Sequence, residues 1–298
     1  MITIRKFNEQ DLDAIQQIHF MSWLQLQWQK DFHGEDAFVA VDDSNQVVGV
    51  AALSYSATWY YIDRPVTHIP DFQMNLEYHV KEDHPQTEQI KLQLLTTMKE
   101  HFATYKKKYP DRTISMRCWC EDSSIADMSF LLKNGLYAHC VTPVLAFDLT
   151  KDIPNYSIPS SIEIGIHSFE GNGMKQYLQA NEMGFDQVQD SEQELWFRLG
   201  GETTKVFTAK DGEQVISSTT VWGMGEGRSA TENIFTIPAY RHKNIARATL
   251  STALQYLKEN GEKQASLTVL GTNRPALAMY YSMGYELIYN LIEMRYTL

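Results

Sequence analysis

The sequence has few cysteines and no long apolar run. Its three cysteines, Cys118, Cys120 and Cys140, form neither a disulfide framework nor the spacing of a metal-binding motif. The longest apolar stretches, such as VVGVAAL at 47–53, are far shorter than the roughly 20 residues of a membrane-spanning helix. We therefore expect no metal site, no disulfide and no membrane partner. Cys118 and Cys120 alternate along an expected strand, which favours two buried thiols on one face.

Positive charge is also scarce. The 26 lysines and arginines are outnumbered by 37 aspartates and glutamates, which gives a net charge of −11. A general nucleic-acid-binding protein usually has a basic surface, so we expect no nucleic-acid partner. The N-terminal segment MITIRKFNEQ lacks the basic start and apolar core of a signal peptide, and a cytoplasmic protein is the expectation.

What the sequence does contain is one pattern written twice. A strand followed by an amphipathic helix begins each half, at 2–20 and again at 162–180. A hairpin signal follows in both, at 38–53 and at 206–221, where two β-rich runs are separated by Asp, Asn, Ser or Gly. A chain of 298 residues is about two domains long, in agreement with a tandem repeat.

The rest of each half also follows one order: a further strand, a long helix, another strand, a short helix and a terminal strand. The two long helices carry apolar residues on one face: Ile90, Leu94, Met98 and Phe102 in the first half, and Ala246, Leu250, Leu254 and Leu257 in the second. Gly135 and Gly284 follow the short helices, where glycine adopts the left-handed conformation that ends a helix.

This order predicts an α/β fold with a mixed sheet (α+β mixed), repeated once. Pro154 and Pro159 stand in a short polar stretch between the halves, which indicates a linker at 151–160. We expect one domain at 1–150 and a second at 161–298.

The stretch TIPAYRHKNIARATL at 236–250 predicts a phosphate-binding turn. The preceding segment, 230–235, has the pattern of a strand, Pro238 ends it, and a helix is expected to begin near Ile245. The first main-chain N–H groups of a helix have no partner within it, and together with the helix dipole they attract anions. Positive charge is added by Arg241, His242, Lys243 and Arg247.

Two motifs in this region resemble those of the GNAT (general-control-related N-acetyltransferase) superfamily. The acyl-CoA loop Q/R-x-x-G-x-G/A is matched by Arg241, Asn244 and Ala246, with asparagine in place of glycine. A second motif, N-x-x-A-x-x-x-Y-x-x-x-G-F/Y, is matched in full at 273–285. The resemblance covers the whole chain as a tandem pair, its motifs only about 230–285. It implies two GNAT-like domains, each a mostly antiparallel sheet flanked by helices.

The resemblance implies an N-acetyltransferase that moves an acetyl group from acetyl-CoA to a primary amine by direct attack, with its site in the second half. Acetyl-CoA is the implied cosubstrate, and no metal is implied. The pantetheine arm is expected along the strand end, the pyrophosphate in the turn, and a further anchor in the following loop. The cofactor-binding residues so implied are Phe235, Thr236, Ile237, Arg241, His242, Lys243, Asn244, Ile245, Ala246, Arg247 and Asn273.

Two residues are implied as catalytic. Tyr280 matches the family tyrosine that points at the cofactor sulfur, and a phenol with a pKa of about 10 can protonate a thiolate with a pKa of roughly 8.5. A core position is the alternative for Tyr280, with its neighbour Tyr281 facing elsewhere. Glu232 is the only carboxylate on the strand and is the candidate base. A shift of one residue would turn Glu232 away, so base and bystander both remain open.

Asn244 raises the question of whether the loop still binds phosphate. Asparagine is the residue other than glycine that best adopts a left-handed backbone conformation. Its side chain must also turn aside, or bind the phosphate itself, to let the ligand approach the main chain. We expect a working loop with somewhat weakened affinity.

The corresponding turn of the first half has lost these features. Gln86, Gln89 and Lys91 stand at the motif positions, and Leu131 replaces the tyrosine. Acidic residues gather in a turn that would receive phosphates: Glu82, Asp83 and Glu88. We expect the first half not to bind acyl-CoA in the usual way of the family.

Aromatic stretches in both halves have two possible uses. The loop at 54–73, and Trp196 and Phe197 in LWFRLGG, either line a substrate pocket or pack in the core or between the halves. A non-catalytic acyl-CoA-binding or scaffold protein is an alternative to the enzyme, as is an acyltransferase with a longer or an aminoacyl donor. The acceptor is a small-molecule or peptide amine, and the sequence specifies neither it nor an oligomeric state.

Overall fold

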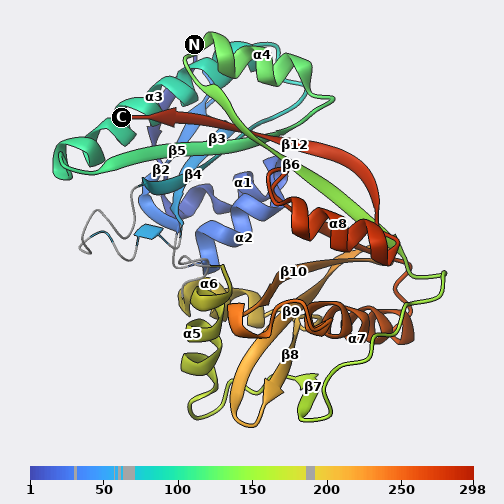
Figure 1. Cartoon of the computed structure of the whole chain (residues 1–298). Coiled ribbons are helices and arrows are strands. Elements are labelled where there is room, and N and C mark those ends of the chain that lie inside the picture. Colours follow the sequence, from blue (N-terminus) through green and yellow to red (C-terminus); the bar gives the residue numbers. More distant parts are fainter. Residues whose placement is uncertain (30–31, 57, 60–61, 63–70, 186–191) are drawn as a thin grey trace. The chain divides into compact units, whose positions relative to one another are not determined.

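The computed structural model describes residues 1–29, 32–56, 58–59, 62, 71–185 and 192–298 (Figure 1). The chain forms two compact units. Unit 1 comprises Met1–Cys118, Phe130–Ala138 and Met294–Leu298, and unit 2 comprises Trp119–Ser129 and His139–Glu293. Neither unit is one continuous segment, because the last residues of the chain belong to the unit that contains its beginning. The domain bounds expected from the sequence are continuous, whereas these units exchange segments.

Unit 1 is a sheet with helices on both faces. Its elements are β1 (Thr3–Lys6), α1 (Leu12–Ile18), α2 (Phe20–Trp28), β2 (Phe32–Val41), β3 (Val47–Tyr55), β4 (Asp71–Val80), α3 (Thr87–Lys108) and most of β5 (Thr113–Glu121). Strands β1 to β4 pair in antiparallel order and β4 pairs with β5 in parallel. The C-terminal end of β12 (Glu286–Thr297) lies next to β5, where Leu298 and Ile114 exchange main-chain hydrogen bonds.

Helix α3 covers one face of this sheet with the apolar residues that the sequence assigned to it (Figure 1). Ile90, Leu94, Met98 and Phe102 are all fully buried. A Cβ atom on Gly49 of β3 would lie 3.0 and 3.1 Å from the side chains of Ile90 and Leu94, so the helix packs closely on the strand. The next residue of β3, Val50, packs instead with Ile15 of α1, which places α1 on the opposite face.

Unit 2 has the same order of elements. It contains β7 (Ile162–Ile166), α5 (Gly173–Phe185), α6 (Glu192–Leu199), β8 (Lys205–Asp211), β9 (Gln214–Gly225), β10 (Arg228–Thr236), α7 (Ile245–Glu259), β11 (Gln264–Thr268) and α8 (Arg274–Met283). Its sheet runs β12-β6-β11-β10-β9-β8-β7, where β6 is Tyr137–Asp148. Only β10 and β11 are parallel among the pairs recorded in this unit. The predicted mixed, mostly antiparallel fold, present twice, is confirmed; α4 (Ile125–Lys133) and β6 are shared between the units.

Two apolar clusters cover the two faces of this sheet. Adjacent residues of β8 point to opposite faces, and Val206 joins the cluster of α5 and α6 while Phe207 joins that of α7 and α8. Helix α7 contributes Leu250, Leu254 and Leu257, all buried as the sequence predicted.

Several local predictions are also confirmed. Helix α7 begins at Ile245. Gly135 and Gly284 have φ angles of 87° and 102°, in the left-handed region expected after a helix. Cys118 and Cys120 are buried. Of the helices that the structure describes, none has the length and apolar content needed to cross a membrane.

Candidate functional site

Strand β10 carries a bulge in the middle of its pairing with β9. Glu232 pairs with Thr220 and Phe235 with Ser218, so β10 has one residue more than β9 between these pairs. Asn233, within the bulge, has a φ of 49°. A bulge bends its strand and increases the local twist, which turns the end of β10 away from the regular path of the sheet.

On its other side, β10 separates from β11. Their recorded pairs cover only Arg228 to Ala230, although β10 continues to Thr236 and β11 to Thr268. The main chain of β10 beyond the last pair therefore has an edge toward β11 without a strand partner among the described residues. Such an edge accepts an extended ligand as an added strand.

The end of β10 is held firmly by unit 2 itself. Ser217 donates a hydrogen bond of 2.6 Å from Oγ to the Phe235 carbonyl, and the Ile237 N–H donates to Ile216 at 2.9 Å. The Thr236 carbonyl accepts from Arg241 Nε at 3.0 Å. Each of the three residues expected along the pantetheine arm, Phe235, Thr236 and Ile237, thus already has one main-chain group hydrogen-bonded within the protein.

Arg241 positions the loop rather than presenting a free charge. Its guanidinium donates to the Gly184 carbonyl at 2.8 Å as well as to Thr236, and so joins the end of α5 to the end of β10. The end of α5 also packs closely against the end of β10, because a Cβ on Gly184 would lie 2.5 Å from Cδ2 of Phe235. If Arg241 contributes to cofactor binding, it does so indirectly, by fixing the position of the loop.

The turn after β10 leaves its main-chain donors unpaired. The N–H groups of residues 242–247 have no acceptor among the residues that the structure describes. His242 and Asn244 have φ angles of 63° and 59°, so the loop enters the left-handed region twice before α7 starts. Left-handed residues other than glycine cost of order 1–3 kcal/mol and concentrate at functional sites. Asparagine in place of glycine therefore does take the conformation that the sequence predicted for it.

The side chain of Asn244 lies along the helix. Its Oδ1 accepts a hydrogen bond of 3.2 Å from Arg247, whose other Nη donates to Ser282 Oγ at 3.2 Å. Exposed Lys243 donates to the Ala239 carbonyl at 3.3 Å and lies over the Tyr240 ring. The positively charged side chains of Lys243 and Arg247 thus lie at the start of α7. Ile245 there is buried and Ala246 is half-buried.

Tyr280 lies in the apolar cluster of α7 and α8. It is 5% exposed, and its ring centroid is 5.7 Å from that of Tyr285. Burial raises the pKa of the Tyr280 phenol above its ordinary value. Tyr281 is 49% exposed, so the two neighbours face apart as expected.

Glu232 faces the other side of β10. Cross-strand partners point to the same face, and its partner Thr220 is fully buried with no hydrogen-bond partner for its hydroxyl among the described residues. Phe235 and Ile216, on this same face, pack with α5. Glu232 itself is half-buried. Glu232 and Tyr280 therefore belong to opposite faces of unit 2.

Asn273 is the N-cap of α8, and this role explains why the motif has an asparagine at this position. Its side-chain oxygen accepts a hydrogen bond of 3.3 Å from the Ala276 N–H. The spacing N-x-x-A is the spacing of a cap to the third helical residue. The amide nitrogen of Asn273 remains as a donor.

The aromatic stretches divide between core and surface. Trp59 is 6% exposed and packs against Tyr55 and Tyr105 of unit 1, while 57, 60–61 and 63–70 of the same loop lie outside the described residues. Trp196 is 53% exposed, which excludes a core position for it.

Comparison with known proteins identifies the family of the region that contains this candidate site. Residues 173–285 match the model of the acetyltransferase (GNAT) family. The second unit carries a GNAT domain. No curated protein sequence matches the chain.

Solved structures show that the GNAT fold extends over both units. A GCN5-related N-acetyltransferase from Sphaerobacter thermophilus aligns with a TM-score of 0.70 at 13% identity, covering 99% of this chain and 95% of that one. A tandem GNAT protein from the clavulanic acid biosynthesis pathway aligns with a TM-score of 0.70 at 13% identity, covering 100% and 98%. A glucosamine N-acetyltransferase region of a fungal multi-domain GH3 β-N-acetylglucosaminidase gives 0.67 at 15% identity, covering 99% and 38%. At these identities the likeness concerns the fold.

Sequence reasoning missed three features of this candidate site. It did not find the bulge, the contact of Gly184 with Phe235, or the bond from Arg247 to Ser282. An asparagine in the middle of a strand, Asn233, was a signal for the bulge, because asparagine is disfavoured in strands and tolerates positive φ.

Proposed function

We propose that unit 2 is an N-acetyltransferase that moves an acetyl group from acetyl-CoA to a primary amine by direct attack. The observation that carries the proposal is the row of unpaired N–H groups at residues 242–247, at the end of a bulged strand and at the start of α7. Main-chain donors at a helix N-terminus bind phosphate groups without a dedicated side chain.

The donor substrate follows the main chain. The pyrophosphate is held by the N–H groups of 242–247, with Lys243 adding positive charge and His242 a polar ring at the exposed rim. The pantetheine arm pairs with the β10 edge that β11 leaves open, first at the bulge residues 232–234, since 235–237 already have partners. The amide nitrogen of Asn273 supplies a further donor.

The acetyl group is transferred at the edge of β10 that β11 leaves open, which Glu232 reaches from one face of the sheet and Tyr280 from the other. The amine nitrogen forms a bond to the thioester carbonyl carbon, and the carbon–sulfur bond breaks. Glu232 takes the proton that the ammonium group loses on becoming the attacking amine. The Tyr280 phenol donates a proton to the departing thiolate, and the second proton, which the nitrogen loses as the amide forms, restores the phenol. Burial keeps Tyr280 protonated at neutral pH. The same apolar surroundings make the thiolate bind a proton more tightly than in water.

A second function, binding of acyl-CoA without transfer, is favoured by the position of Tyr280 in an apolar cluster. Both functions need the loop, and only the first needs the phenol and the carboxylate. An enzyme for longer acyl donors shares the loop and differs in the acyl chain that it accepts.

The test is release of free CoA thiol from acetyl-CoA on a panel of primary amines, with a small metabolite, an amino sugar, a peptide N-terminus and a lysine peptide. Amine-dependent release, lost in Tyr280→Phe and reduced in Glu232→Gln, supports the enzyme. Tight binding without release on any amine supports the binding protein. Equal release from acetyl-CoA and from longer acyl-CoA donors contradicts acetyl specificity, and no binding at all contradicts both functions.

A further inference from the structure

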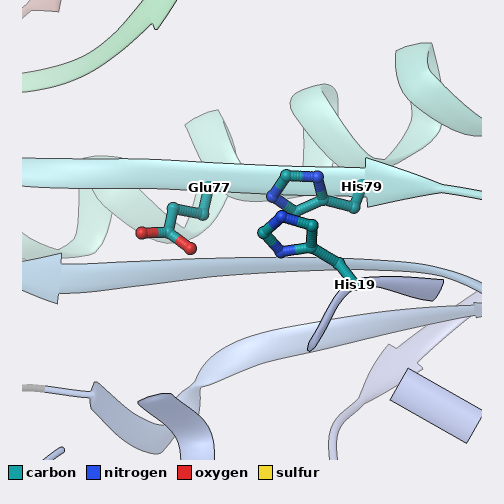
Figure 2. A group of neighbouring side chains, drawn as sticks. All are labelled: His19, Glu77 and His79. Carbon is teal, nitrogen blue, oxygen red and sulfur yellow. The ribbon is translucent and has the colours of Figure 1, made fainter. Parts of the chain in front are cut away.

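Three side chains with metal-binding atoms meet in unit 1, far from the loop of unit 2 along the chain. One ligand atom each of His19, Glu77 and His79 lies within 4.8 Å of the other two, and all three residues are half-buried (Figure 2). Glu77 and His79 are two residues apart in β4 and point to one face. His19 lies between α1 and α2, which puts the cluster on the face covered by these helices.

Helix α2 supplies partners for two of the three side chains. Gln25 donates from Nε2 to Glu77 Oε1 at 3.2 Å. His19 caps α2, with its Nδ1 accepting from the Ser22 N–H at 3.2 Å and lying 2.9 Å from Ser22 Oγ. Metal-bound histidines and carboxylates are held in this way by outer hydrogen bonds, with the second ring nitrogen of the histidine engaged elsewhere.

We propose that His19, Glu77 and His79 bind one divalent first-row transition-metal ion, with Zn²⁺ as the reference ion. Two imidazole nitrogens and one carboxylate oxygen are a donor set that such ions favour. Three protein ligands leave a fourth tetrahedral position for water or a small ligand. The cluster is not part of the acetyltransferase site proposed for unit 2, so the inference goes beyond that function.

The three ligand atoms must move closer together to hold an ion. A tetrahedral zinc ion with bonds of about 2.0–2.1 Å holds its ligand atoms roughly 3.3 Å apart, which these atoms reach by closing about 1.5 Å at most. The two imidazole rings are stacked, with centroids 3.4 Å apart and planes 10° from parallel. Lone pairs in parallel planes do not converge, so one ring tilts when the ion binds. The proton of His19 then moves to Nδ1, where Ser22 Oγ accepts it, and Nε2 becomes the ligand atom. This change replaces the bond from the Ser22 N–H to Nδ1 by the bond from Nδ1 to Ser22 Oγ.

The ion ties the start of α2 to β4. In the repeated order of elements, β4 is the counterpart of β10, and its face toward α1 and α2 is the counterpart of the face that carries Glu232. A carboxylate and two imidazoles taken out of water together are unfavourable without compensation, and a bound cation supplies it. Metal binding thereby stabilises unit 1.

The experiment uses the full chain without an affinity tag, stripped with a chelator and dialysed. Zn²⁺ is titrated against a competing chromophoric chelator, and Co²⁺ is added to a second sample to follow its visible absorption. We expect one ion per chain, the strong visible bands of tetrahedral Co²⁺, and a rise in melting temperature with Zn²⁺. Glu77→Gln keeps the shape of the side chain and His79→Ala removes a ligand, and both are expected to lose the site. Gln25→Ala is expected to bind about 10- to 100-fold more weakly.

The control is His139→Ala, which removes an exposed histidine outside the cluster and is expected to keep one site. Circular dichroism of each metal-free variant separates loss of the site from loss of the fold. Wild type that binds no stoichiometric Zn²⁺ overturns the proposal. So does a folded Glu77→Gln or His79→Ala variant that binds as tightly as wild type.

Discussion

The strand-to-helix turns of the two units stand at the same place in the repeated order of elements and use their main chain in different ways. In unit 2, the N–H groups of 242–247 point to no acceptor in the described chain. In unit 1, the turn after β4 has several paired donors: Lys81 donates to the Val48 carbonyl, His84 to Lys81, and Thr87 to His84. Its N–H groups without an acceptor among the described residues are those of Glu82, Asp83, Glu88 and Gln89, and they do not form one continuous row. The Gln86 N–H donates to His84 Nδ1 at 3.1 Å.

The strands that lead into the two turns differ as well. Strand β4 pairs with β3 from Met74 to Val80 without any shift of register, whereas β10 carries its bulge between Glu232 and Phe235. Only the bulged strand is followed by six consecutive N–H groups without an acceptor among the described residues. We therefore expect the course of the main chain, and not charge alone, to decide which of the two turns binds the phosphates of acyl-CoA.

The helices after the parallel strands show a smaller difference. Leu131 of α4 occupies the place in the motif that Tyr280 has in α8, and both are almost completely buried. A buried position with similar packing in both copies needs no hydroxyl for stability. Packing therefore does not explain the hydroxyl group of Tyr280, which is the part of the residue that a chemical role would use.

The largest effect is expected from Tyr280→Phe. The change removes a proton donor and keeps the buried ring, so kcat should fall about 10²- to 10⁴-fold while acetyl-CoA affinity and melting temperature stay unchanged. Steady-state kinetics and calorimetry measure the two. Tyr281→Phe, at an exposed neighbour, is the control and should behave as wild type. Unchanged kcat in Tyr280→Phe would assign the tyrosine to the core alone.

A smaller effect is expected from Gly184→Ala. The new Cβ meets Phe235 at the end of the bulge, and overpacking of this kind costs about 1–3 kcal/mol. The strand end that moves is the one proposed to pair with the cofactor, so acetyl-CoA affinity should also fall. A fall of roughly tenfold corresponds to about 1.4 kcal/mol of that cost acting on the bound state alone. Gly165→Ala in β7 is the matched control, since its Cβ would meet nothing within 4 Å. Equal behaviour of the two variants in calorimetry would show that the bulge does not depend on this contact.

The smallest effect is expected from Asn244→Gly. Glycine takes the left-handed conformation freely and removes a side chain that already lies toward Arg247, so acetyl-CoA affinity should rise by no more than about threefold. Asn45→Gly changes a left-handed asparagine in the hairpin of unit 1 and should leave affinity unchanged. Binding that is absent in wild type and appears only in Asn244→Gly would mean that the asparagine closes the site.

The sequence predicted the parts of this molecule that depend on local interactions. The start of α7 at Ile245, the buried faces of α3 and α7, and the left-handed Asn244 all follow from residue type and spacing. Each is decided within a few residues of chain, where periodicity and backbone preference act.

The parts that the sequence did not predict depend on residues far apart. Nothing in the sequence indicated that the guanidinium of Arg241 donates to the carbonyl of Gly184, 57 residues away. The end of β12 completes the sheet of unit 1. The cluster of His19 with Glu77 and His79 joins a helix start to a strand. No spacing pattern in the sequence predicts such contacts, because they join residues that only the folded chain brings together.

The most direct test of the account is the number and place of acetyl-CoA sites, measured by calorimetric titration. Three proteins are compared: wild type, Lys243→Glu with Arg247→Glu in unit 2, and Lys81→Glu with Lys91→Glu in unit 1. The two double variants carry the same change of charge. We predict one site per chain in wild type and in the unit 1 variant, and affinity at least tenfold weaker in the unit 2 variant. Two sites in wild type, or loss of binding in the unit 1 variant alone, would contradict the assignment of binding to the turn of unit 2.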